Sequence, residues 1–272
     1  MIKISQNIKQ ILFATIITLG LMLIVNAKNS ANDSVLIPAI LTSTGILIVQ
    51  VYIIYRRAKQ KLENLQIPLV HRYKNSLELF YHFILPIIFF VDLCLFIYFN
   101  TVYLLIPLLL FFCFIIFLIL FINIRAYFED KFKIEIATHF VYYFIINFTV
   151  FSLCLSILSI SYSYDLPIIL TGIIIGGMSS LMLYLNHIEA SQLNLKLFGG
   201  ILAYGLLNMI MALVLFQEFN SILRTSFIIA SCFYFLNALL THKKEGTFGM
   251  AIILEYLTIL ALGFVVLFGI NQ

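Results

Sequence analysis

Two carboxylates lie inside long apolar segments, where an ionisable side chain is costly and is a functional candidate by default. Asp92 lies within the stretch IFFVDLCLF, and Glu255 lies within AIILEYLTIL. A carboxylate that has lost its water can exchange a proton near neutral pH, as a proton- or cation-coupled transporter requires. Alternatively, each carboxylate hydrogen-bonds a neighbouring helix and fixes its packing. The two are expected on opposite sides of the membrane midplane, so we do not expect them to form one pair.

The histidines are a second candidate group, because all of them are predicted on the same side of the membrane. His187 and Glu189 form a His-x-Glu pair, and His139 and His242 could converge with them on a metal ion or a substrate headgroup. Their spacing does not match a metal-binding helix such as His-Glu-x-x-His. The alternative is that the histidines are scattered along the interface. We therefore predict no metal ion and no cofactor.

Small residues mark a candidate helix contact. Gly172 and Gly176 are four positions apart in one apolar segment, and Gly199 and Gly200 begin the next segment. Small residues at such spacing let two membrane helices approach closely. We predict that these two segments form a tight internal pair.

Motifs that would indicate catalysis are absent from the sequence. It has no glycine-rich phosphate loop, no aspartate-rich diphosphate motif and no paired-glutamate motif of intramembrane proteases. Its 4 cysteines all lie within apolar segments and lack metal-ligand spacing, which is typical of small core residues. We therefore assign no catalytic residue, and an enzyme is the least favoured class.

Composition indicates which elements must position these residues. Of the 272 residues, 63% are hydrophobic and 10% are charged, whereas soluble domains have about 45–50% apolar and about 25% charged residues. The apolar segments are about 20 residues long, as membrane-spanning helices are, and they lack the alternation of barrel strands. We predict an all-α, polytopic transmembrane bundle of about nine spans. The spans are expected near residues 10–27, 35–55, 78–99, 101–124, 138–160, 166–187, 197–216, 219–241 and 248–269.

The basic residues predict the orientation of the bundle. Cytoplasmic connections of membrane proteins are enriched in lysine and arginine. With nine spans and a cytoplasmic N-terminus, only Lys28 and Arg224 of the 16 basic residues fall outside. A different number of spans in the middle of the chain would place basic residues on both sides of the membrane. The sequence thus predicts a multi-pass protein of the cytoplasmic (inner) membrane.

The first apolar segment has two interpretations. Residues 1–10 are basic, residues 11–25 have the length of a signal-peptide core, and residues 25–27 would serve as a cleavage site. Cleavage would leave eight spans and the rest of the topology unchanged. The alternative is a retained signal anchor that pairs with the second segment.

No low-complexity tract or soluble domain is visible, so we predict one integral membrane domain over residues 1–272. Within it, residues 1–60 would form an N-terminal helical hairpin and residues 78–270 a seven-helix bundle. The predicted partner is the lipid bilayer, with no nucleic acid. The basic stretch 56–74 could attract anionic lipid headgroups, or it could serve only to set the topology.

Three polar stretches at the ends of apolar segments carry a resemblance to a known family. They are FINIRAYFEDKFKIEIATH, LNHIEASQLNLKL and the start of THKKEGTFGMAIILEYLTILALGFVVL. Over residues 70–269 the chain resembles an uncharacterised family of small polytopic membrane proteins from candidate-phyla bacteria. The resemblance implies a helical membrane fold. It implies no activity and no site residues, because the family has no assigned function.

Two classes of function follow from these observations. The leading interpretation is a structural or interaction role in the cytoplasmic membrane. The runner-up is a transporter of a small solute, an ion or a lipid that uses Asp92 or Glu255. A transporter should bring polar residues to a cavity within the membrane, whereas a structural protein should have a filled bundle.

Overall fold

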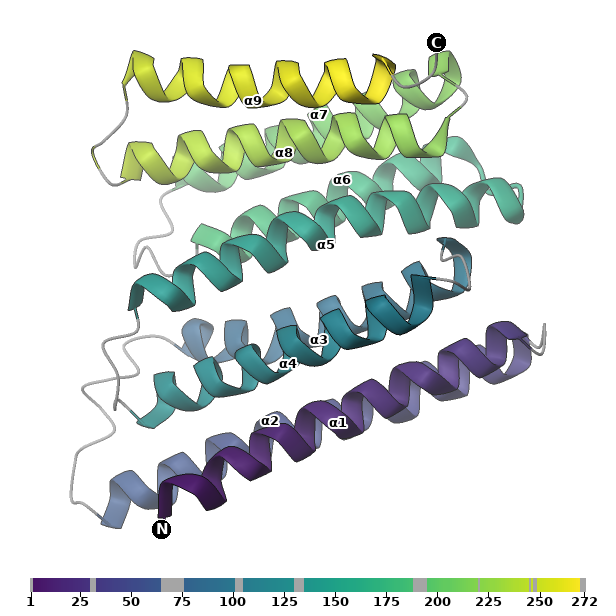
Figure 1. Cartoon of the computed structure of the whole chain (residues 1–272). Helices are drawn as coiled ribbons and strands as arrows, with labels where there is room; N and C mark the ends of the chain where they lie inside the picture. Colours follow the sequence, from purple (N-terminus) through teal and green to yellow (C-terminus); the bar gives the residue numbers. More distant parts are fainter. Residues whose placement is uncertain are drawn as a thin grey trace. The chain divides into compact units, whose positions relative to one another are not determined.

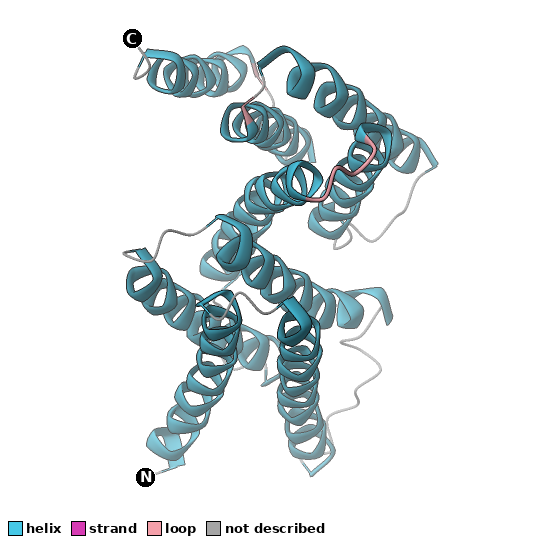
Figure 2. Ribbon diagram, turned by 90° about the vertical axis from the view of Figure 1, so that its right-hand side faces the viewer, coloured by secondary structure: helices cyan, strands magenta, loops and turns pink. Residues whose placement is uncertain are grey.

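The computed structural model of the chain describes residues 2–29, 33–64, 76–100, 105–129, 135–187, 195–219, 221–244, 246 and 249–269. Nearly all of this part is helical (Figure 1 and Figure 2), which confirms the all-α prediction for it. In chain order its helices are α1 (Ile2–Asn29), α2 (Asp33–Asn64), α3 (Ser76–Asn100), α4 (Ile106–Glu129), α5 (Glu135–Ser163), α6 (Ile168–His187), α7 (Leu195–Phe219), α8 (Ile222–Lys244) and α9 (Met250–Gly269).

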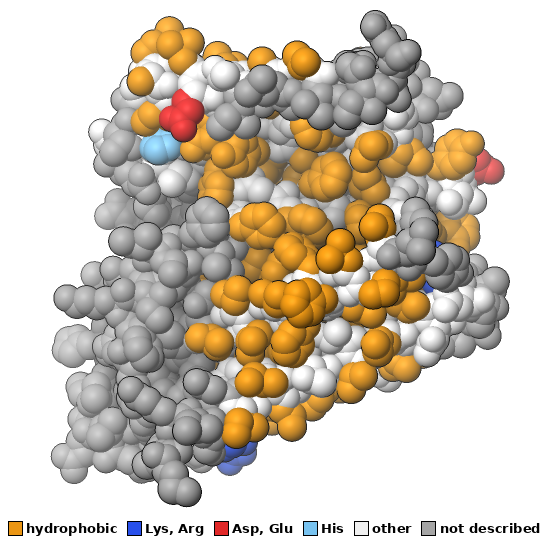
Figure 3. Space-filling view, in the orientation of Figure 1, with side chains coloured by type: hydrophobic (Ala, Val, Ile, Leu, Met, Phe, Trp, Pro, Cys, Tyr) orange, Lys and Arg blue, Asp and Glu red, His pale blue; other side chains and the backbone are white. Residues whose placement is uncertain are grey.

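Among the described residues, 5 helices are long and apolar enough to cross a membrane. Such a helix needs about 20 residues, because it rises about 1.5 Å per residue through a core about 30 Å thick. Among the described residues on the face shown in Figure 3, the exposed side chains are largely hydrophobic. These features indicate an integral, multi-pass membrane protein. The candidate spans are Ile8–Asn29, Ile37–Arg57, Tyr142–Ser163, Ile168–Asn186 and Ile222–His242.

The chain separates into two compact units, Met1–Ile145 and Ile146–Gln272, which we call the N-terminal unit and the C-terminal unit. In the N-terminal unit, α1 contacts α2, α3 and α4, and these three helices also contact one another. The hairpin α1–α2 is therefore packed together with α3 and α4. Aromatic side chains fill part of this core: the rings of Phe89 and Phe90 lie 5.5 and 6.1 Å from that of Phe117.

Helix α1 contributes directly to the core of the N-terminal unit. Its apolar residues recur every three or four positions, as they do on the buried face of a helix. At Gly20 the helix lies so close to α2 that an added Cβ would meet Ser43 Oγ at 2.7 Å. At the end of the helix, Lys28 Nζ donates a 2.9 Å hydrogen bond to the backbone carbonyl of Ile97 in α3. The buried face consists of Ala14, Ile17, Leu21, Ile24 and Ala27, each at most 1% exposed.

The C-terminal unit is built around an extensive contact between α6 and α7, to which α8 and then α9 are added. Among the polar contacts that link neighbouring helices here, two are short. Asn186 Nδ2 of α6 donates a 2.6 Å hydrogen bond to Asn237 Oδ1 of α8. Thr171 of α6 donates a 2.7 Å hydrogen bond to the hydroxyl of Ser161 in α5. Polar pairs of this kind fix which helix faces meet within a membrane.

Candidate functional site

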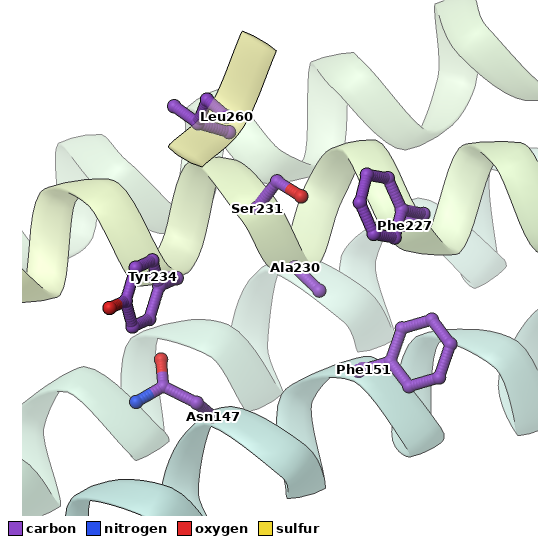
Figure 4. Close-up of a pocket in the computed structure, with 7 residues that line it drawn as sticks. All are labelled: Asn147, Phe151, Phe227, Ala230, Ser231, Tyr234 and Leu260. Carbon is purple, nitrogen blue, oxygen red and sulfur yellow. The ribbon is translucent and has the colours of Figure 1, made fainter. Parts of the chain in front are cut away.

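A pocket of about 380 Å³ lies between α5, α8 and α9 of the C-terminal unit (Figure 4). Ligand pockets in proteins have volumes of about 300–1,000 Å³, with mostly apolar linings and a few polar groups. This pocket fits that description at the small end of the range. Its lining residues are Asn147, Phe151, Phe227, Ala230, Ser231, Tyr234 and Leu260.

Helical spacing explains how these residues reach one cavity. Asn147 and Phe151 are four positions apart on α5, so they lie one above the other on the same face. The four residues of α8 follow the same rule, because Ala230, Ser231 and Tyr234 come three, four and seven positions after Phe227. Helix α9 adds Leu260. A single face of each helix therefore supplies the lining.

The lining is polar at one end and apolar at the other. In Figure 4, the amide of Asn147 and the ring of Tyr234 face each other, and Phe151 and Phe227 lie together farther along the same helices. From Phe227 to Tyr234 the helix advances about 10 Å. Since α8 ends at Lys244, the polar end is the one nearer the turn between α8 and α9. The site is thus an open, amphipathic pocket whose polar end lies nearer the end of α8.

Two side chains beyond the lining hold Tyr234 in place. The ring of Tyr256 in α9 packs edge-on against Tyr234, with ring centroids 5.4 Å apart. His242 of α8 lies 5.9 Å from the Tyr256 ring, and His242 Nε2 is 3.4 Å from the Tyr256 hydroxyl. His242, which the sequence suggested for a metal or headgroup site, thus supports the polar end of the pocket through Tyr256.

The described lining residues offer groups that can bind a ligand. No charged side chain is among its described lining residues, and Ser231 has no histidine or carboxylate beside it in that lining. A serine needs an adjacent general base to act as a nucleophile. By contrast, an amide, a phenol and a hydroxyl can each donate and accept hydrogen bonds. The pocket is therefore suited to a neutral molecule with one polar end.

The two carboxylates singled out in the sequence are in different surroundings. Asp92 of α3 is fully buried in the N-terminal unit, within electrostatic range of the thiols of Cys94 and Cys113. Glu255 of α9 is exposed. Neither one is among the described residues that line the pocket. Their roles in transport stay a prediction.

The predicted histidine cluster falls mostly outside the described side chains. His139 and His187 belong to α5 and α6, but their side chains are not among those described, and Glu189 lies outside the described residues. Within the described part of the chain, no group of three or more His, Cys, Asp or Glu residues could hold a metal ion. A shared site of these residues with His242 stays a prediction.

The four glycines predicted to pair α6 with α7 differ in their environments. Gly172 lies against Leu213 of α7, and Gly176 lies against the backbone of Gly205, where an added Cβ would be 2.5 Å from the carbonyl oxygen. Gly199 and Gly200 are exposed, and an added Cβ there would meet nothing within 4 Å. On α7 the close contact is made by Gly205, where a Cβ would overlap Ser180 Oγ.

Sequence reasoning missed both Gly205 and the pocket. A glycine inside an apolar helix is itself a signal of close approach, so Gly205 could have been included. Asn147 and Tyr234 also stand out as polar residues in apolar spans. That they face each other depends on the rotation of two helices, which spacing along one helix does not reveal.

Comparison with known proteins gives no assignment of family or function. No protein-family model matches the sequence, and no curated protein or solved structure matches it significantly. The resemblance to polytopic proteins of candidate-phyla bacteria therefore stays a prediction, and any function must be argued from the chain itself.

Proposed function

We propose that this chain crosses the cytoplasmic membrane nine times from a cytoplasmic N-terminus and binds a small, neutral, mainly apolar molecule within the bilayer. The pocket between α5, α8 and α9 is the observation that carries the second half of this proposal. Binding of this kind is the first step of solute or lipid transport, the runner-up class suggested by the sequence. It differs from the earlier hypothesis because the pocket residues, rather than Asp92 or Glu255, hold the solute.

The charge distribution supports the topology, and the packing of α1 supports the count of spans. A cleaved signal peptide would remove the buried face from Ala14 to Ala27 and expose the apolar surfaces of α2, α3 and α4 that it covers. We therefore infer that residues 1–29 are retained as a signal anchor. Mass spectrometry of the purified protein should find the intact N-terminus, whereas a chain that begins near residue 28 would overturn this inference.

Binding in the pocket can be tested with a tryptophan reporter, because the chain contains no tryptophan. The variant Phe227→Trp, reconstituted in lipid nanodiscs, places a fluorophore in the pocket wall. Bromoaromatic probes such as 4-bromotoluene and 4-bromophenol quench tryptophan on contact. We expect saturable quenching of this variant by at least one of the two probes.

Two controls separate binding from simple partition into lipid. Leu206→Trp places the reporter on α7 at a side chain that is 60% exposed, and its quenching should rise without saturation. Adding Ala230→Leu to the pocket reporter narrows the pocket and should weaken the saturable part. If quenching of the pocket reporter rises without saturation for both probes, as in the Leu206→Trp variant, the proposed binding function is wrong.

One observation favours the structural or interaction role as a second candidate. Glu255 is exposed on α9 between Leu254 and Leu257, which are 55% and 46% exposed. A carboxylate on an apolar membrane helix is costly unless it meets a polar partner, so this face of α9 is a candidate contact with another membrane protein. Glu255→Leu should then weaken a complex isolated in mild detergent and leave probe binding unchanged.

A further inference from the structure

The arrangement of polar and apolar residues in the pocket indicates a ligand class narrower than apolar molecules in general. We propose that it selects a neutral amphiphile with a single hydroxyl group, which enters from the membrane leaflet on the side where α8 ends and α9 begins. This inference rests on the proposed binding function of the same pocket and names its ligand class and route of entry.

The hydroxyl group is selected by the polar end of the pocket. The amide of Asn147 and the hydroxyl of Tyr234 each carry a donor and an acceptor, and their side chains face each other in Figure 4. A ligand hydroxyl placed between them can donate to one group and accept from the other. A ligand carboxylate or ammonium would find no counter-charge among the described lining residues, and burying an unpaired charge is strongly unfavourable.

The apolar end determines the size of the remaining part of the ligand. Phe151 and Phe227 offer two rings to a hydrophobic body, and Leu260 adds an aliphatic side chain elsewhere in the lining. An apolar cavity of about 150 Å³ is enough to hold benzene. At about 380 Å³, this pocket has room for a ring with a short substituent, or for the hydroxyl end of a longer lipid.

The direction of the pocket matches the orientation of an amphiphile in one leaflet. Membrane amphiphiles keep their polar group near the interface and their apolar part towards the midplane. Here the polar pair lies nearer the end of α8, and Phe151 and Phe227 lie farther into the helices. An amphiphile of the leaflet on that side can enter without reversing its orientation. In the topology proposed above, this is the cytoplasmic leaflet.

A preorganised tyrosine makes the selection sharper. The contacts from His242 to Tyr256, and from Tyr256 to Tyr234, restrict the Tyr234 ring before a ligand arrives. Because the ring is already held, less conformational entropy is lost when its hydroxyl binds the ligand.

The test compares two probes that differ in one group. With the full chain carrying Phe227→Trp in nanodiscs, quenching by 4-bromophenol is compared with quenching by 4-bromotoluene, which has a methyl group in place of the hydroxyl. Each titration is corrected for partition with the Leu206→Trp variant. One net hydrogen bond corresponds to about 3- to 10-fold in affinity, so we expect 4-bromophenol to bind about 3- to 10-fold more tightly. The anion 4-bromobenzoate should give no saturable quenching.

Two variants locate the preference at the polar end. Tyr234→Phe removes one hydroxyl without changing shape, and Asn147→Leu removes the amide. Each should reduce the preference for 4-bromophenol over 4-bromotoluene to less than about 2-fold. Tyr162→Phe changes a tyrosine that is 69% exposed outside the pocket and should leave the preference intact.

The outcomes distinguish this inference from the binding function on which it rests. Equal affinity for the two probes, or a preference that survives Tyr234→Phe and Asn147→Leu together, would overturn the hydroxyl selection while leaving the pocket a binding site. The absence of saturable quenching by either probe would overturn both. An unbrominated long-chain alcohol identifies the source: relief of 4-bromophenol quenching indicates a membrane lipid, whereas no relief indicates a free small molecule and would overturn entry from the leaflet.

Discussion

The C-terminal unit contains two helix contacts that are built in opposite ways. Between α6 and α7, glycines let the backbones touch, and Gly176 lies directly against the carbonyl of Gly205. Between α5, α8 and α9, the rings of Phe151 and Phe227 stand in the interface, and a cavity of about 380 Å³ remains among the side chains.

The difference shows how one unit can be closely packed in one place and leave an open pocket in another. Small residues remove the side chains that would separate two helices, so dispersion contacts and close polar contacts accumulate there. Larger side chains hold helices farther apart, and among those of α5, α8 and α9 an open pocket remains. We infer that α6–α7 is the scaffold of the unit and that α5, α8 and α9 form its binding region.

The largest expected effect on stability comes from disrupting the close contact between α6 and α7. Gly205→Leu would place a side chain where even a Cβ overlaps Ser180 Oγ and approaches the carbonyl of Gly176. Overpacking usually costs about 1–3 kcal/mol, and a clash with backbone should reach the upper end of that range or exceed it. Thermal unfolding in detergent should therefore show a large loss of stability or no folded protein.

A matched change on the same helix serves as the control. Gly199 is exposed and has open space around it, so Gly199→Leu adds the same side chain to α7 without a clash. Its stability should stay within about 0.5 kcal/mol of the original chain. Equal destabilisation by the two variants would show that helix propensity or expression, rather than the α6–α7 contact, determines the result.

The next largest effect on stability is expected from a larger side chain in the pocket between α5, α8 and α9. Ala230→Leu puts a larger apolar side chain into the cavity wall, and filling a cavity commonly stabilises a protein by about 0.5–2 kcal/mol. The melting temperature should rise while probe binding is weakened. Ala203→Leu adds the same atoms to an exposed position on α7 and should change neither property. A fall in stability with Ala230→Leu would mean that the region is already filled.

The same two regions show what could be predicted from the sequence. Apolar length is a local property, so the helices were predictable. The tendency of Gly172 and Gly176 to lie at a helix contact is also local, because small residues on one face invite close approach. The partner on α7 depends on the register between two helices. That register brings Gly205, and neither Gly199 nor Gly200, to the contact.

The pocket is harder to predict because it arises where side chains of three helices pack incompletely, and no local sequence motif encodes it. Asn147, Tyr234 and Leu260 come from three helices that are distant in sequence. Each residue alone is typical of a membrane span, and the local sequence pattern does not indicate that a pocket remains between their side chains. The role of His242 illustrates the same limit: its position near a helix end was readable, but its contact with Tyr256 follows from the packing of α8 on α9.

A smaller effect is expected from the amide pair that joins the two regions. Asn186 of α6 and Asn237 of α8 share a 2.6 Å hydrogen bond, which ties the scaffold to a helix that lines the pocket. Interhelical hydrogen bonds in membranes contribute about 0.6 kcal/mol on average and up to about 1.7 kcal/mol. A double-mutant cycle with Asn186→Leu and Asn237→Leu should give a coupling energy in this range, and additive effects would contradict the link.

The smallest effect should come from His242, which acts on the pocket only through Tyr256. His242→Phe keeps a ring against Tyr256 but removes the nitrogen that lies 3.4 Å from its hydroxyl. Stability should change by less than about 0.5 kcal/mol, as is usual for a partly exposed site. Affinity for 4-bromophenol should fall by about 2-fold or less, and affinity for 4-bromotoluene should not change. A loss as large as that of Tyr234→Phe would mean that His242 contacts the ligand, and the polar end of the pocket would then extend to the end of α8.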